Sequence, residues 1–299
     1  RCSRDWSSDV CSSDLAVMAE TEKPTSIDDV KDWWQTAIVD IAPNSIRFRG
    51  YAVQDLIGTV SFPAMIWLML RGELPTPAQA DLFGALLVSA VDHGPQAPSI
   101  AIARMSASCG VGINNAIASG VNALGDVHGG AGQQCMHLFS DITQAAAKSS
   151  SLNDAVQNGL DTYRREHGKF IPGFGHRFHR VDPRVTRLSE LLDTAVKNKM
   201  IEGKFLAIGR AVGEALGKTA PIGMNVDGIT AVLLLELGFP AELGRGVFVL
   251  SRSVGICAHS LEQMQQGHRI KGPTPPDVGF RYTGPAPRGV PAQAQVVNK

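Results

Sequence analysis

Apolar residues recur at spacings of three and four along most of this chain, the period of a helix that buries one face. Runs that alternate apolar and polar residues are few, and residues 45–51 form the one that predicts a small hairpin. Ser26 and Thr76 each stand directly before a helical run, where such residues cap helices. We therefore predict an all-α (mainly α) fold. The predicted helical stretches are residues 27–38, 77–92, 101–124, 205–216 and 229–237.

The composition argues against several classes of protein. The chain has 299 residues, of which 44% are hydrophobic, enough for one large domain or two of ordinary size. Its 28 basic residues balance 28 acidic ones, which argues against a nucleic-acid or membrane-surface partner. The best apolar run, residues 62–70, is far short of the roughly 18 residues that indicate a membrane span. We expect a cytoplasmic protein.

The first fifteen residues look foreign to the rest of the chain. They carry a Ser-Ser-Asp near-repeat and resemble the translated read-through of a sequencing adapter. A processed leader is the alternative, but aspartates interrupt any apolar signal core. We interpret residues 1–17 as a non-native leader or artefact and expect the protein to begin at Met18. The cysteines that then remain, Cys109, Cys135 and Cys257, are odd in number and widely spaced, which fits reduced thiols.

Three short segments hold the side chains that a reaction site needs, each beside glycine or proline. The first is Asp-Val-His-Gly-Gly-Ala around His128, the second Pro-Gly-Phe-Gly-His-Arg around His176, and the third Asn-Val-Asp-Gly around Asp227. In the second, two histidines and three arginines fall within residues 176–184 with a single acid, Asp182. Arginine grips carboxylate or phosphate with a planar fork. The pattern predicts an acid/base site for an anionic substrate, with a solvated basic loop as the alternative for the second segment alone.

These three segments, in this order, resemble the signature segments of the citrate synthase family. The region around them agrees, because Arg-Gly-Tyr at 49–51 is similar to the family's entry hairpin and Arg-Ser-Val-Gly at 252–255 to its Arg-x-x-Gly helix. The resemblance runs over residues 45–282. It implies the citrate synthase fold and a homodimer. The implied domains are a large helical domain from residues 18–128 and 230–299 and a smaller helical domain inserted at residues 129–229.

Two stretches resemble the citryl-CoA lyase module that ends ATP-citrate lyase, and its free-standing bacterial relatives. They are Asp-His-Gly-Pro at 92–95 and residues 246–253, together with Asn-Val-Asp-Gly at 225–228, although His128 sits where that module carries another residue. The resemblance implies a citryl-CoA lyase, which cleaves citryl-CoA into acetyl-CoA and oxaloacetate. Citrate synthase or 2-methylcitrate synthase, which also hydrolyse the thioester, are the alternatives. The coenzyme A thioester would be a co-substrate beside a 2-oxo dicarboxylic acid, and no permanently bound cofactor is implied.

The resemblance implies three catalytic residues. The α-carbon of an acetyl thioester is a very weak acid, so its deprotonation needs a base and a hydrogen-bond donor to the enol oxygen at once. By resemblance, Asp227 is the base and His128 donates to the thioester oxygen as a neutral imidazole. His176 would hydrogen-bond the carbonyl of oxaloacetate and stabilise the alkoxide that forms from it.

Further residues are implied to bind the substrates. His93 would help to hold oxaloacetate, while Arg184 and Arg252 would clamp its carboxylates. The family takes a further arginine from the neighbouring subunit, in an Arg-Pro step that reads Gly-Pro at 272–273 here. Arg269 is our candidate to replace it, with Lys271 and Arg281 as alternatives. The candidates for binding coenzyme A are Gly173, Gly175, Arg177 and Arg180.

Three of these residues have simpler structural explanations. His93 would cap a helix end or make a hydrogen bond in the core. Asp227 would serve as an N-cap for a helix from Ile229, a common role for aspartate. Arg252 would pair with Glu262 on a helical face. The small residues of 101–124 would likewise fit a dimer interface or the core of one chain equally well.

Two functions from other classes compete with the enzyme. A metal protein lacks any tight ligand pair in this sequence, so we expect no metal site. A catalytically silent, CoA-binding scaffold of the same fold would keep coenzyme A affinity without proton exchange. The residues weighed as metal ligands are His128, Cys135, His137, His176 and His179.

Overall fold

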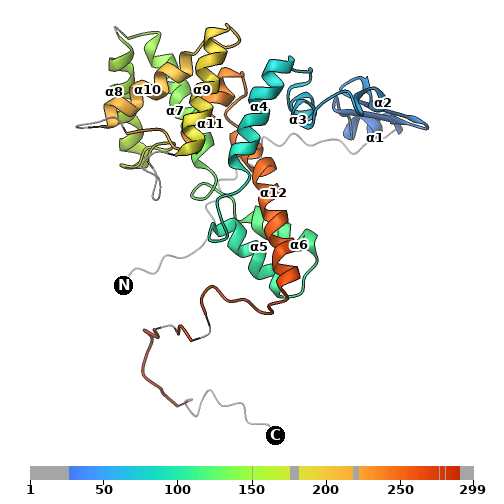
Figure 1. Ribbon diagram of the computed structural model, residues 1–299, viewed down its shortest axis with the longest axis vertical. Helices are drawn as coiled ribbons and strands as arrows, with labels where there is room; N and C mark the ends of the chain where they lie inside the picture. Colours follow the sequence, from blue (N-terminus) through green and yellow to red (C-terminus); the bar gives the residue numbers. More distant parts are fainter. Residues whose placement is uncertain are drawn as a thin grey trace. The chain divides into compact units, whose positions relative to one another are not determined.

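The computed structural model describes residues 27–149, 151–175, 182–217, 222–275, 277–279 and 281–289. Within these ranges the chain is built mainly from helices, with one small sheet, which confirms the predicted mainly α fold (Figure 1). The chain divides into two compact units, the first ending at Leu74 and the second beginning at Pro75. The domain inserted at residues 129–229 stays a prediction.

The first unit contains a three-stranded antiparallel sheet. Strands β2 and β3 are joined by a turn in which Arg49 and Gly50 both have positive φ, the backbone of a tight hairpin turn. The Arg49 guanidinium donates to the Met69 carbonyl at 2.8 and 3.3 Å and so joins the hairpin to α3. The predicted hairpin is confirmed. The elements are α1 (Ile27–Trp33), β1 (Val39–Ala42), β2 (Ser45–Phe48), β3 (Tyr51–Ala52), α2 (Val53–Leu56) and α3 (Phe62–Arg71).

The helix predicted over residues 27–38 is too long. α1 ends at Trp33, and the chain enters β1 at Val39, which pairs with Phe48. The Thr36 hydroxyl accepts a hydrogen bond from the Ile38 amide at 3.1 Å. Local bonds of this kind compete with the helical hydrogen-bond ladder, and they favour a turn at this point.

The second unit is helical throughout its described part. Its first helix, α4, begins as predicted: Thr76 accepts from the Gln79 amide at 3.3 Å while the Gln79 side chain accepts from the Thr76 amide at 2.9 Å. The helices are α4 (Pro77–Ala90), α5 (Pro98–Ser108), α6 (Ile113–Asn122), α7 (Ala131–Ala146), α8 (Leu152–His167), α9 (Pro183–Lys197), α10 (Lys204–Leu216), α11 (Val226–Glu236) and α12 (Leu243–Gln266).

Two helices organise the second unit. α11 is apolar all round, which is typical of a helix enclosed by others, and it packs against α4, α7, α9 and α10. Its Ile229 and Leu233 are completely buried. α12 is the longest helix described and packs against α4 and α7 as well as α5 and α6 (Figure 1).

The small residues of 101–124 pack within the chain. The stretch forms two helices, α5 and α6. Between them lies Gly110, whose positive φ of 86° does not fit a right-handed helix. A Cβ added at Gly120 would lie 2.8 Å from the Ser99 carbonyl oxygen and 2.9 Å from the Ile256 side chain. Gly120 therefore lets α6 approach both α5 and α12. These residues serve the core, and their part in a dimer stays a prediction.

Two further observations concern the described residues alone. Cys109, Cys135 and Cys257 are free thiols in the part of the chain that the structure describes. Among the described helices, none combines the length and the apolar character needed to cross a membrane.

Candidate active site

Asp227 does not cap helix α11, so its carboxylate is available for catalysis. Helix α11 begins at Val226, and Asn225 is its N-cap: the Asn225 side-chain oxygen accepts from the amides of Asp227 at 2.9 Å and Gly228 at 3.2 Å. The interpretation of Asp227 as the cap of a helix starting at Ile229 is therefore wrong. Its carboxylate, in the first turn of α11, has no capping bond to make.

The second segment lies directly on the start of α11. The Asn225 amide donates to the Gly173 carbonyl at 2.9 Å, and the Asn225 side-chain amide donates to the Gly175 carbonyl at 2.8 Å. The Gly175 amide in turn donates to the Gly223 carbonyl at 3.2 Å. A Cβ on Gly228 would fall far inside van der Waals contact with the Gly173 oxygen. Two of the three signature segments are thus held side by side.

The first segment reaches Asp227 through α7, the helix that follows it. A Cβ on Gly132, in the first turn of α7, would lie 4.0 Å from the Asp227 Oδ1. Phe248 of α12 supports the same loop, because a Cβ on Gly129 would lie 3.2 Å from its ring. The same ring lies under the Arg252 guanidinium, 4.8 Å from the ring centroid.

Two guanidinium groups act on Asp227. Burial raises the pKa of the Asp227 carboxyl, the positive charges of Arg184 and Arg252 lower it, and the negative charge of Asp182 raises it again. Burial prevails, so the pKa of Asp227 is raised. A carboxyl with a raised pKa binds a proton more tightly than a free one and is the better base at neutral pH.

Arg252 is a buried charge at this site, with 4% of its surface exposed. Its Nε donates to the Ala90 carbonyl at 3.0 Å. Burial lowers the pKa of Arg252, while the carboxylates of Asp92 and Asp227 raise it. The alternative pairing with Glu262 is wrong, since Glu262 is bonded to Arg104 of α5.

Arg184 is held by the acid of its own segment. Its Nε and Nη2 donate to the two oxygens of Asp182 at 2.9 and 2.7 Å, a bidentate pair. Asp182 also caps α9, since its Oδ1 accepts from the Arg184 amide at 3.0 Å. The cap fixes where the Arg184 fork is presented.

His128 is held in one neutral form. The Ser99 amide donates to its Nε2 at 3.2 Å, and the Ser99 hydroxyl lies 3.0 Å from the same nitrogen. A nitrogen that accepts from an amide carries no proton, so the neutral ring carries its proton on Nδ1. Burial, and then the charge of Arg252, lower the pKa of His128. The predicted neutral donor therefore has a structural basis.

The remaining predicted residues lie in different places. His93 occupies the turn after α4, beside Asp92, whose charge acts on Arg252. Arg269 is exposed next to the end of α5, where the Ile270 amide donates to the Ser108 carbonyl at 3.0 Å. At 1.5 Å per residue, that end lies roughly 14 Å from Ser99 and His128. The predicted residues outside the described ranges are His176, Arg177, His179 and Arg180.

Three residues near the site were missed from the sequence. Ser99 carries a detectable signal, because Pro98 marks the first helical position and leaves the next amides without helical partners. Arg104 and His259 carry none, since each lies inside a helix and their contact joins positions 155 residues apart in the sequence. Among the described residues, no group of three or more His, Cys, Asp or Glu is placed to hold a metal ion.

Comparison with known proteins identifies the family. The model of the citrate synthase C-terminal domain matches residues 32–85 and 75–274. The chain belongs to the citrate synthase family. The resemblance inferred from the three segments is confirmed.

Relatives and solved structures add detail. The chain is 34% identical to the citryl-CoA lyase of Hydrogenobacter thermophilus, with a TM-score of 0.76 over 87% of this chain and 98% of that one. The ATP citrate lyase of Methanothrix soehngenii, solved with citrate and coenzyme A, shares the fold at 21% identity and a TM-score of 0.71, over 95% of this chain and 45% of that one. The citrate synthase of Haloferax volcanii is 31% identical over 221 residues, 72% of this chain and 53% of that protein. The chain spans about half the length of the curated citrate synthases it matches.

Proposed function

We propose that this protein is a citryl-CoA lyase, which cleaves citryl-CoA into acetyl-CoA and oxaloacetate. The observation that carries the proposal is Asp227: it is not used as a cap, its pKa is raised by burial, and it lies within reach of the charges of Arg184 and Arg252. Similarity over nearly the whole length of the Hydrogenobacter lyase favours cleavage as the reaction.

The proposed chemistry is most easily followed in the direction of condensation. The Asp227 carboxylate takes a proton from the methyl group of acetyl-CoA, while the Nδ1 proton of His128 is donated to the thioester oxygen as the enol forms. As the enol carbon bonds to the keto carbon of oxaloacetate, the enol O–H proton returns to Nδ1 of His128, while His176 stabilises the alkoxide and gives it the proton that completes the hydroxyl group of citryl-CoA. Cleavage is the reverse, with Asp227 returning its proton to the carbon.

Substrate binding belongs to the same proposal. His93, Arg184 and Arg252 would hold the oxaloacetate portion, since two guanidinium charges fixed near Asp227 attract and orient a dicarboxylate. Arg269 lies at the opposite end of α5, which suits use by a neighbouring subunit better than by its own site. The proposed coenzyme A residues are Gly173, Gly175, Arg177 and Arg180.

Citryl-CoA itself provides the direct test. Purified protein is incubated with citryl-CoA, and acetyl-CoA, oxaloacetate, citrate and free coenzyme A are quantified separately by mass spectrometry. Acetyl-CoA with oxaloacetate and little citrate is the expected result. Citrate with free coenzyme A would replace the lyase proposal with a synthase.

A synthase is the second candidate because the curated relatives include a citrate synthase and a citrate/2-methylcitrate synthase. Supplying propionyl-CoA in place of acetyl-CoA separates a citrate synthase from a 2-methylcitrate synthase, because only the second should condense propionyl-CoA efficiently. A silent scaffold would bind coenzyme A but leave the methyl protons of acetyl-CoA unexchanged in heavy water, which mass spectrometry detects.

We also propose a cytoplasmic homodimer with a smaller inserted domain at residues 129–229. The exposed Arg269, at the opposite end of α5 from His128, supports an assembly in which copies of the chain share a site. Light scattering of the purified protein should give twice the 31.8 kDa mass of one chain. The mass of a single chain would contradict the dimer.

A further inference from the structure

A chain of polar contacts that includes none of the proposed catalytic residues His128, His176 and Asp227 connects α5, α12 and the turn after α4. Arg104 of α5 is buried, and its Nη1 lies 3.0 Å from His259 Nδ1 while its Nη2 donates to the Gln266 side chain at 2.9 Å. His259 Nε2 lies 3.3 Å from the Asp92 Oδ1. The other Asp92 oxygen, Oδ2, accepts from the Gly94 amide at 3.0 Å.

The direction of these bonds is determined by Arg104. A guanidinium has donors only, so His259 Nδ1 must accept, and the neutral ring carries its proton on Nε2. That proton points to Asp92. The carboxylate thus receives one bond from His259 and one from the turn amide, and it bridges α12 to the turn.

The turn that Asp92 holds is the one that carries His93. Gly94 has a φ of 90°, a conformation that glycine adopts readily and that a hydrogen bond to Asp92 keeps in place. α12 lies close against this turn, since a Cβ on Gly255 would lie 3.1 Å from Asp92 Oδ1 and clash with the Val91 carbonyl. The Asp92 carboxylate also acts on the Arg252 guanidinium. Two proposed oxaloacetate contacts therefore depend on one carboxylate.

We propose that His259 is a positioning residue for the oxaloacetate half of the site. Arg104 fixes the tautomer of His259, and the Nε2 proton of His259 bonds to the Asp92 carboxylate. Asp92 in turn fixes the turn that carries His93 and supplies a counter-charge to Arg252. The role rests on the proposed function, because it presumes that oxaloacetate binds there. His259 itself touches no substrate in this scheme.

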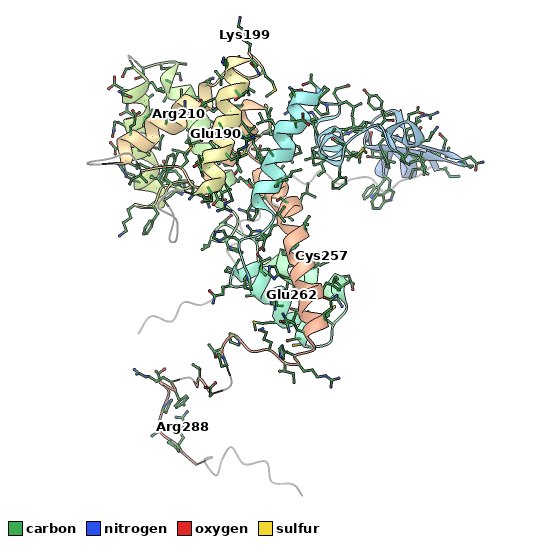
Figure 2. All side chains as sticks on the ribbon, viewed as in Figure 1. Glu190, Lys199, Arg210, Cys257, Glu262 and Arg288 are labelled. Carbon is green, nitrogen blue, oxygen red and sulfur yellow. The ribbon has the colours of Figure 1, made fainter. Side chains whose placement is uncertain are left out.

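Two substitutions of similar size separate this role from packing. His259→Gln places an amide N–H near the position of Nε2 and keeps a donor to Asp92. His259→Asn places its amide near Nδ1 and leaves Asp92 without that donor. Glu262→Ala is the control on α12, where Figure 2 labels Glu262: it removes another partner of Arg104, one that also lies 3.8 Å from His259 Nδ1, and leaves the bond between His259 Nε2 and Asp92 in place.

Calorimetric titration gives the dissociation constants of oxaloacetate and of coenzyme A for each protein. For His259→Asn we expect oxaloacetate to bind about tenfold more weakly, the usual effect of one lost hydrogen bond. Coenzyme A affinity should not change, and His259→Gln and Glu262→Ala should match the wild type for both ligands. Nitrogen-15 spectra of the wild-type histidines should show His259 protonated on Nε2.

The contradicting results are distinct. Equal oxaloacetate affinity in the Gln and Asn variants, or a His259 protonated on Nδ1, would overturn the positioning role. Parallel loss of both ligands with lowered stability in both variants would reduce His259 to a packing residue, which also overturns it. A wild-type protein that binds no oxaloacetate and leaves citryl-CoA intact would instead overturn the proposed function on which the role rests.

Discussion

Asp227 shows how one residue acquires a chemical role from its neighbours. Asn225 supplies the cap of α11, so the Asp227 carboxylate remains available, and burial raises its affinity for a proton against the pull of Arg184 and Arg252. A carboxyl in this position combines what a base at an α-carbon needs: desolvation, and fixed cations nearby to hold an anionic substrate.

Replacing Asp227 by Asn should lower kcat for citryl-CoA cleavage about 10³-fold, as expected for the loss of a general acid–base group. Oxaloacetate and coenzyme A should still bind, because the amide preserves the shape of the side chain. Asp193→Asn, which removes an exposed carboxylate paired with Arg210, is the control and should keep full activity. Steady-state kinetics of both variants would refute the assignment if D227N kept its turnover.

The raised pKa of Asp227 also predicts a pH dependence of stability. The folded protein holds this proton more tightly than the unfolded chain does, so the stabilisation is complete below the ordinary value of 3.8 and is lost as pH rises through the raised pKa. D227N cannot ionise. The difference in free energy of unfolding between D227N and the wild type should therefore shift in favour of D227N as pH rises above about 4. Urea titrations at a series of pH values measure this difference. A difference that is independent of pH would contradict the raised pKa.

His128 should titrate below the ordinary value of 6.5, because burial and the charge of Arg252 both oppose protonation. Its imidazole then stays neutral at pH 7, with the proton on Nδ1. Nitrogen-15 spectra followed over pH give both the midpoint and the tautomer. Arg252→Met should raise the midpoint by removing the nearby charge, and an unchanged midpoint would show that burial acts alone.

At the scale of elements, close backbone approach decides whether the signature segments meet. Gly173 lies against Gly228 so tightly that a Cβ on Gly173 would be 2.7 Å from the Gly228 Cα and from the Cys135 sulfur. Hydrogen bonds from Asn225 to the 173–175 loop follow from this contact. Side chains at either glycine would separate the loop from α11.

Gly228→Ala should accordingly lower the free energy of unfolding by about 1–3 kcal/mol, the usual cost of overpacking. Activity should fall as well, because the loop that leads into His176 is displaced from Asp227. Gly246→Ala is the matched control in α12, where an added Cβ meets nothing within 4 Å. That change should be neutral or stabilising by up to about 1 kcal/mol. Equal stability of the two variants in chemical denaturation would argue against the tight contact.

For the whole molecule, the division after Leu74 makes a prediction about folding. The core residues from Ala80 onward pack among helices of the second unit, including Phe83 stacked on Phe239 at 5.1 Å. A fragment that begins at Pro75 should therefore fold by itself, with helical circular dichroism and one cooperative thermal transition. A fragment without a cooperative transition would show that the second unit needs residues of the first.

Local features were predictable because their causes lie within a few residues. The mainly α class follows from the three- and four-residue spacing, the start of α4 from Thr76 and Gln79, and the hairpin from the alternation around Arg49 and Gly50. The length of α1 was overestimated, since the pairing of residues 39–42 with β2 lies outside any helical pattern.

The candidate site was predictable as a set of residues but not as an arrangement. Sequence alone determined the family and the chemical types present: Asp227, His128 and the arginines among glycine-rich segments. Tertiary structure decided that Asn225 bonds to the 173–175 loop, that Ser99 fixes the tautomer of His128, and that Glu262 bonds to Arg104. The physical reason is the distance along the chain over which each interaction acts. Helix caps and hydrophobic periodicity involve residues close together in the sequence. Proton positions and charge partners depend on which helices pack together, and burial of apolar surface over the whole chain decides that packing.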